Sequence, residues 1–175
     1  MNRTALLLPA LLAACAGYTP LYAPASAAGN LAERVEVGTV EMAYIREENV
    51  GERRVAQAVS QRLRQDFPHA GTDKDVLAIS ITEEAAALAL RRTALVEREQ
   101  LSLTAHITLT DPQGAVLYTG GVGSSAAYNV ETTPYSTESG KNFARQSAAE
   151  NLAEEIIRRL ALYYHQHPKT PPLAP

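Results

Sequence analysis

The sequence predicts an α/β fold: a two-layer sandwich with two helices packed on one face of a four-stranded, mostly antiparallel sheet, in the order β-α-β-β-β-α. Two observations predict it. Four segments are rich in β-branched residues or alternate apolar with polar residues, and two others repeat apolar residues every three or four positions. Because each helix has one apolar stripe and each strand one apolar face, we expect the helices to cover one face of the sheet and leave the other open.

Size and composition suit one domain. The chain has 175 residues, of which 46% are hydrophobic, and a formal net charge of −3. That length can bury a core. The near-neutral charge gives no basic field, so we expect no nucleic-acid partner. The single cysteine, Cys15, excludes an internal disulfide framework and a cysteine-based zinc cluster.

The first residues predict a signal peptide over 1–14. Arg3 is the only charge before Glu33, and an apolar run follows it that is too short to span a membrane. Leu12-Ala13-Ala14-Cys15 resembles the bacterial lipobox, in which the chain is cut before the cysteine and the thiol receives lipid. Cys15 is therefore the expected lipidation site, with palmitate among the acyl chains that anchor the chain to a membrane. The alternative is an ordinary signal peptide with a chance cysteine.

The remaining chain divides by composition. Residues 15–32 have no charge and are rich in Ala, Pro and Gly until Leu31, which indicates a lipidated N-terminus and flexible tether. Residues 33–166 form the expected single α/β domain, and the proline-rich residues 167–175 an expected disordered tail. Position 16 is Ala and not Asp, the inner-membrane retention residue of enteric bacteria, which favours the outer membrane.

The first half of the domain gives a strand, a helix and a second strand. Residues 34–45 are rich in β-branched residues and predict a strand. Asn49 has the spacing of a helix cap, and the helix that follows ends at Pro68. Its apolar stripe consists of Val55, Ala58, Val59, Leu63 and Phe67. Residues 75–90 begin with alternating apolar residues and predict the second strand.

The second half gives a hairpin and a long helix. In residues 98–110 apolar residues alternate with hydroxyl residues and His106, which predicts a half-buried strand. The turn Asp111-Pro112-Gln113-Gly114 joins it to a strand over 115–130. The last helix is expected from Ser136 or Ser139 to His165, with an apolar stripe of Ala144, Ala148, Leu152, Ile156, Leu160 and Tyr163 or Tyr164.

Residues 112–130 contain no charged side chain. Such a stretch is compatible with a covered central strand. It is equally compatible with a surface for another protein, because the cores of interfaces are depleted in charge.

No pattern in the sequence demands catalysis or a resident metal or cofactor. His165 and His167 fit surface histidines better than a metal pair. Glu83 and Glu84 have Arg91, Arg92 and Arg98 nearby in the sequence, which favours ion pairs at a solvated strand end over an acid/base dyad. These arginines either partner the acidic residues or contact an anionic lipid, because the guanidinium fork suits phosphate and carboxylate.

The opening Cys15-Ala16-Gly17-Tyr18-Thr19-Pro20-Leu21-Tyr22 resembles the C-G-[FY]-x-P-L-Y start of the lipopolysaccharide-assembly lipoprotein family LptE, in its alphaproteobacterial branch. Ala16 departs from the pattern. Looser matches follow in order over nearly the whole mature chain: Arg91-Arg92, the 103–109 strand, the Asp111/Gly114 turn, Tyr128-Asn129, Tyr135 and the last helix.

The resemblance implies a non-enzymatic outer-membrane lipoprotein. LptE-like proteins sit as a plug inside the LptD β-barrel, assist its assembly, bind lipopolysaccharide and help deliver it to the outer leaflet. The implied lipopolysaccharide-binding residues are Arg91, Arg92 and Arg98. The implied partner-facing residues are Ser102, Thr104, His106, Thr108, Tyr118, Tyr128 and Asn129.

Two other classes of function compete with this one. A lipoprotein that scaffolds or activates a cell-wall enzyme would share the anchor, the tether and a small α/β domain. A periplasmic hydrolase would need an acid/base or nucleophile set, and the sequence supplies no such set.

Overall fold

A four-stranded sheet and three helices make up the part of the chain that the structure, a computed structural model, describes: residues 31–44, 50–68, 71, 73–89 and 97–167. The elements follow in the order α2 (Leu31–Arg34), β1 (Val35–Met42), α3 (Val50–Asp66), β2 (Asp75–Ala89), β3 (Glu97–Thr110), β4 (Val116–Val130) and α4 (Pro134–Gln166). The predicted fold class and the β-α-β-β-β-α order are confirmed, with the short α2 added before β1.

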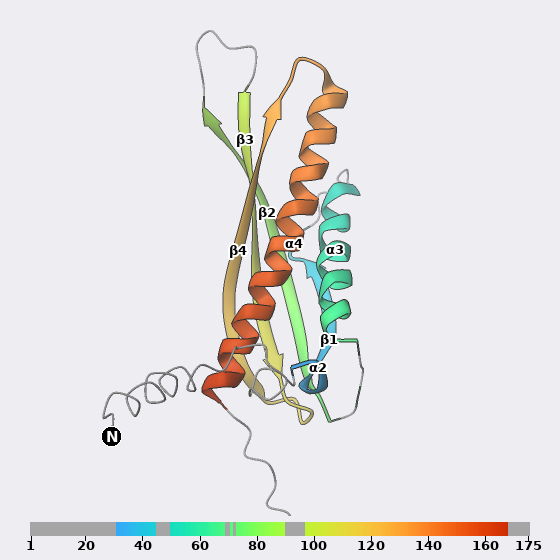
Figure 1. Cartoon of the computed structure of the whole chain (residues 1–175), viewed down its shortest axis with the longest axis vertical. Coiled ribbons are helices and arrows are strands. Elements are labelled where there is room, and N and C mark those ends of the chain that lie inside the picture. The colour runs from blue at the N-terminus through green and yellow to red at the C-terminus, as the bar shows by residue number, and fades with distance from the viewer. Residues whose placement is uncertain (1–30, 45–49, 69–70, 72, 90–96, 168–175) are drawn as a thin grey trace, which may run out of the picture.

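The strands lie in sequence order, β1-β2-β3-β4. β1 pairs with β2 in parallel, and the other two pairs are antiparallel. The parallel pair is joined by α3, because parallel neighbours need a crossover connection. Figure 1 shows α3 and α4 side by side on one face of this sheet, with α4 running diagonally across it.

The core lies between the sheet and the two helices. On β3 the alternate residues Leu101, Leu103, Ala105, Ile107 and Leu109 are all 0% exposed. Both long helices bury most of their predicted stripes: Val55, Val59 and Leu63 of α3 are buried together with Phe67, which follows that helix, as are Ala144, Ala148, Leu152, Ile156, Leu160 and Tyr164 of α4. Removing this apolar area from water is the main force that holds the layers together.

The predicted hairpin turn is confirmed between β3 and β4. The Asp111 side chain accepts hydrogen bonds from the backbone N–H of Gln113 at 2.9 Å and of Ala115 at 2.7 Å. Gly114 has a positive φ of 89°, which glycine adopts without the steric cost that a Cβ imposes.

Three boundaries differ from the prediction. The expected tether, 15–32, ends sooner, because Leu31 begins α2 and is buried. The α4 helix begins earlier than Ser136, at Pro134, because proline fits the first helical turn where its missing N–H costs nothing. It also reaches Gln166, and His167 still donates its N–H to the Tyr163 carbonyl, so the expected tail loses its first residue.

β4 is an edge strand, so the expectation of a covered central strand is wrong. α4 covers only one of its faces. Cys15, Asn49, Arg91 and Arg92 lie outside the described residues.

Candidate functional site

The sheet has one face that no described element covers. We call this the open face, and it consists of the outward-facing residues of the three longer strands: Val76, Ala78, Ser80, Thr82, Glu84, Arg98, Gln100, Ser102, Thr104, His106, Thr108, Thr110, Thr119, Gly121, Gly123, Ser125, Ala127 and Asn129. All of them are exposed or half-buried. The face follows directly from the period-2 pattern of β3, whose other residues fill the core.

Strand register brings hydroxyl residues and glycines into rows across the open face. Thr104 lies between Thr82 of β2 and Gly123 of β4, and the next row sets His106 between Ser80 and Gly121. Gly121 and Gly123 have no side chain, so nothing projects from β4 beside His106 and Thr104 and another backbone can approach closely there. The rows of Thr104, His106 and Thr108 carry no charged group on the three longer strands, whereas Glu84 lies opposite Ser102 and Arg98 lies opposite Asn129 toward one end of the face.

Such a surface can meet another protein at low desolvation cost. Hydroxyl groups can exchange water for polar groups of a partner, whereas a charge left unpaired in an interface is strongly penalised. Four predicted partner-facing residues, Ser102, Thr104, His106 and Thr108, lie together here, and Asn129 lies on the same face further along β4.

Two predicted partner-facing residues do not lie on the open face. Tyr118 packs toward α4, with its ring centroid 5.3 Å from that of Tyr163. Tyr128 is 6% exposed, and its hydroxyl donates to the Glu99 carboxylate. Both residues have even numbers, and the even-numbered residues of β4 after the register shift between Leu109 and Thr110 face the helices, so neither tyrosine contributes to the open face.

The predicted basic group is described only in part. Arg98 is exposed on β3 opposite Asn129, at the end of the sheet where β2 ends and β3 begins. Arg91 and Arg92 lie outside the described residues, so the grouping of the three arginines stays a prediction.

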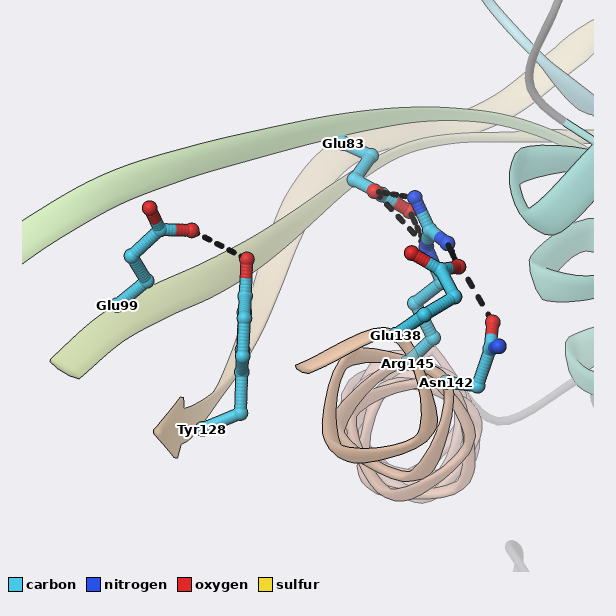
Figure 2. Close-up of polar contacts among 6 residues, drawn as sticks. All are labelled: Glu83, Glu99, Tyr128, Glu138, Asn142 and Arg145. Atoms are coloured by element: carbon cyan, nitrogen blue, oxygen red, sulfur yellow. Dashed lines mark hydrogen bonds and ion pairs between the residues drawn. The ribbon is translucent and has the colours of Figure 1, made fainter. Parts of the chain in front are cut away.

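A buried polar cluster lies beneath the same end of the sheet (Figure 2). The Arg145 guanidinium of α4 donates to both Glu83 carboxylate oxygens, from Nε at 3.0 Å to each and from Nη2 to Oε1 at 2.8 Å. The two side chains are only 4% and 6% exposed. Glu138 lies 3.7 Å from Arg145 Nη1, and Asn142 accepts a hydrogen bond from the same nitrogen.

The expected ion pair of Glu83 with a neighbouring arginine is therefore wrong, because Glu83 points inward between the layers and its partner is far away in the sequence. Sequence reasoning missed Arg145. A signal was present: Arg145 stands four residues before Ala149 and seven before Leu152, at the helical spacing that puts it on the buried face of α4.

Two buried tyrosines donate hydrogen bonds between elements: Tyr128 links β4 to β3, and Tyr164 links α4 to β2. Burial, and then the bond to Glu99, raises the pKa of Tyr128 well above its ordinary value. Burial, and then the bond to Asp75, does the same to the pKa of Tyr164, whose hydroxyl donates to Asp75 at 2.5 Å. Arg34 lies 4.1 Å above the Tyr164 ring. Both tyrosines stay neutral at physiological pH and act as hydrogen-bond donors, not as acids.

The described residues offer little for other chemistry. They contain no group of three or more His, Cys, Asp or Glu side chains placed to hold a metal ion. Within the same residues, no helix is both long enough and apolar enough to cross a membrane. The candidate site within these residues is therefore the open face of the sheet.

Comparisons with known proteins agree with this fold. A family model described as "LptE: Lipopolysaccharide-assembly" matches residues 37–160. The rare lipoprotein B from Shewanella oneidensis is similar in structure, with a TM-score of 0.56 at 14% identity, over 78% of this chain and 99% of that one. An uncharacterized lipoprotein B from Nitrosomonas europaea has a TM-score of 0.53 at 11% identity, over 79% and 90%. No curated protein matches the sequence.

Proposed function

Because this chain belongs to the LptE lipopolysaccharide-assembly family, we propose that it plugs and helps assemble an LptD-like β-barrel in the outer membrane and helps deliver lipopolysaccharide to the outer leaflet. The observation that carries the barrel contact is the open face. Its centre is uncharged and rich in hydroxyl groups, and the helices cover the opposite face of the sheet.

The chemistry of a barrel interior fits this face. The lumen of a transmembrane barrel is polar, and closure leaves the barrel no strand edges. A plug therefore needs polar groups without unpaired charge on the surface that meets the wall. Ser102, Thr104, His106 and Thr108 supply such groups along one strand, and the glycines opposite them allow close approach.

The proposal includes a lipid anchor at Cys15. Several acyl chains on one residue give stable attachment, whereas one chain alone gives marginal binding. We infer that Cys15→Ala leaves the precursor uncut by the lipoprotein peptidase and without lipid. Labelling cells with radioactive palmitate measures this, and label that persists on the variant would contradict the lipobox.

For lipopolysaccharide, we propose Arg98 together with Arg91 and Arg92 as the contact to phosphate or carboxylate groups. Arg98 is exposed at the end of the open face, where a ligand can reach it. Arg91→Glu with Arg92→Glu should weaken lipopolysaccharide binding in a displacement assay without changing the unfolding midpoint. Unchanged binding would remove these residues from the site.

No reaction is assigned to the chain. Binding and assembly require a shaped surface and an anchor, and neither requires a nucleophile or an acid/base pair. We propose that the protein acts without enzymatic activity and without a cofactor.

The test is purification of the lipidated chain from detergent-solubilised outer membrane. The proposal predicts that a barrel of the size of LptD co-purifies in a stoichiometric amount. Cys15→Ser, which keeps the domain and removes the anchor, is the matched control and should recover less of the barrel. Absence of any such barrel from the wild-type preparation would overturn the proposal.

A further inference from the structure

The two edges of the sheet differ in how they are protected. β1 is 8 residues long, carries Glu36 and Glu41, and has a register shift between Val37 and Val40. β4 is 15 residues long, has no charge and no proline, and pairs with β3 without a shift from Tyr118 to Val130. Shortness, charge and bulges are the devices by which proteins keep sheet edges from pairing with other chains. β1 has all three, whereas β4 has only one register shift, at its beginning between Val116 and Tyr118.

The outward backbone groups of β4 can be assigned from the register. Asp111 N–H donates to the Ala115 carbonyl at 2.9 Å, and Ala43 N–H donates to the Ile81 carbonyl at 2.8 Å. Because successive residues of a strand direct their N–H and C=O to opposite sides, odd residues of β3 bond toward β4. The groups that point away from the sheet then belong to Thr119, Gly121, Gly123, Ser125, Ala127 and Asn129.

Two hollows lie beside this edge, each with α4 as its other wall, and together we call them the groove. One hollow of about 440 Å³ lies between Gly123 and Ser125 of β4 and Asn151 of α4, and a second of about 420 Å³ lies between Val116–Thr119 and Gln166. The helix wall is a stripe at helical spacing: Asn151, Glu155, Arg158, Leu162 and Gln166. A groove between an edge strand and a helix is a recurring geometry for capture of an extended peptide.

The second hollow is lined by exposed apolar side chains and by an arginine, and these groups indicate what kind of segment could bind there. Val116 and Leu162 are 61% and 43% exposed there, although both are large and apolar. Arg159 lines the same hollow and makes no ion pair with any residue in the described ranges, whereas Arg158 pairs with Glu155. An apolar side chain and a carboxylate would satisfy these groups.

We propose that β4 receives an additional strand from a partner protein, an extended segment without basic residues that places an apolar side chain between Val116 and Leu162 and an acidic one at Arg159. The partner's backbone pairs with the outward groups of β4, and alternate side chains of the segment enter the groove. This inference stands apart from the barrel contact, because it uses the backbone groups of the β4 edge and the α4 side of the sheet and not the side chains of the open face.

The experiment is photocrosslinking in the cells that make the full, anchored chain. A benzoylphenylalanine at Asn151 and another at Gln166 lie in the two hollows, and one at Gln146 serves as a matched control on the other flank of α4, which faces α3. We expect a protein adduct from the first two positions and none from the third. Fifteen helical residues separate the probes, about 22 Å, so the two crosslinked partner residues should lie about seven apart in one segment.

Two variants test the pairing and the charge. Ser125→Pro removes one outward N–H and leaves the β3 ladder intact, so the adduct should fall about fivefold relative to Ser125→Ala. Arg159→Glu should lower it about tenfold relative to Arg159→Lys. If Ser125→Pro fails to fold, the comparison of Arg159→Glu with Arg159→Lys and the spacing of the crosslinked partner residues still test the inference.

The inference is overturned by adducts that contain only this chain, by partner residues scattered over separate segments, or by equal yields from all three probe positions. A barrel that co-purifies without an adduct from Asn151 or Gln166 also overturns it, and leaves the proposed function standing. An adduct with a protein that is not a barrel supports the inference. It counts only against the proposed partnership with a barrel.

Discussion

The two faces of β3 are held by different forces. Leu103 and Thr104 are neighbours on one strand, yet Leu103 is fully buried under the helices and Thr104 is exposed on the open face. The inner residue is constrained by packing, since a lost methylene leaves a cavity. The outer residue is free of that constraint. The hydroxyl-rich, uncharged centre of the open face is therefore not needed for folding and is the better indicator of function.

The largest effect should come from breaking the buried ion pair of the inner layer. Arg145→Met leaves the Glu83 carboxylate buried without its guanidinium partner, and should lower the free energy of unfolding by about 3–5 kcal/mol. Urea denaturation measures the loss. The double variant with Glu83→Leu should recover most of it, because the uncompensated charge is gone. A single variant as stable as the wild type would contradict the burial of this pair.

A cavity in the inner face should have the next largest effect. Leu103→Ala removes a side chain that is 0% exposed, and should cost about 2–5 kcal/mol of unfolding free energy. The same denaturation curves measure it. A loss below 1 kcal/mol would mean that the helices do not cover this face in solution.

The buried tyrosine at Asp75 should give a smaller, pH-dependent effect. Because the pKa of Tyr164 is raised in the folded chain, its stabilisation is complete below its unfolded pKa of about 10 and is lost as the pH rises above that value. Tyr164→Phe removes one donor to Asp75 and should cost about 1–3 kcal/mol at neutral pH.

The alkaline branch separates this hydrogen bond from simple packing. Between pH 9 and pH 11 the variant should lose less stability than the wild type, because the phenylalanine cannot ionise. Parallel losses in both chains would show that Tyr164 titrates normally in the folded state.

The smallest effect is expected on the open face. Thr104→Val keeps the β-branched shape, and should change the unfolding free energy by no more than about 0.5 kcal/mol, because the side chain is exposed and no described element covers that face. A loss comparable with that of Leu103→Ala would mean that the open face contributes to the core.

Local periodicity explains which parts of the fold were predictable. The alternation of β3 and the stripes of α3 and α4 depend on neighbours within one element, and most of the residues predicted to be buried there are buried. The turn at Asp111 and Gly114 has the same local origin.

What the sequence could not predict depends on distant partners. Small residues occupy both faces of β4, so its sequence does not show which face is buried. Pairing with β3 is what turns Tyr118 and Tyr128 toward the helices. Arg145 finds Glu83 across 62 positions. The position of β4 at the sheet edge is likewise a property of the strand order, which no single segment specifies.

The central claim is that the open face is the surface that meets the barrel. Thr104→Glu with His106→Glu puts two charges at its centre, and Gln57→Glu with Gln146→Glu makes the same charge change on exposed positions of the helices. The measurement is the amount of barrel that co-purifies with each folded variant from solubilised outer membrane. The account predicts a loss of about tenfold or more for the open-face variant and none for the helix variant. Equal recovery with both variants would contradict it.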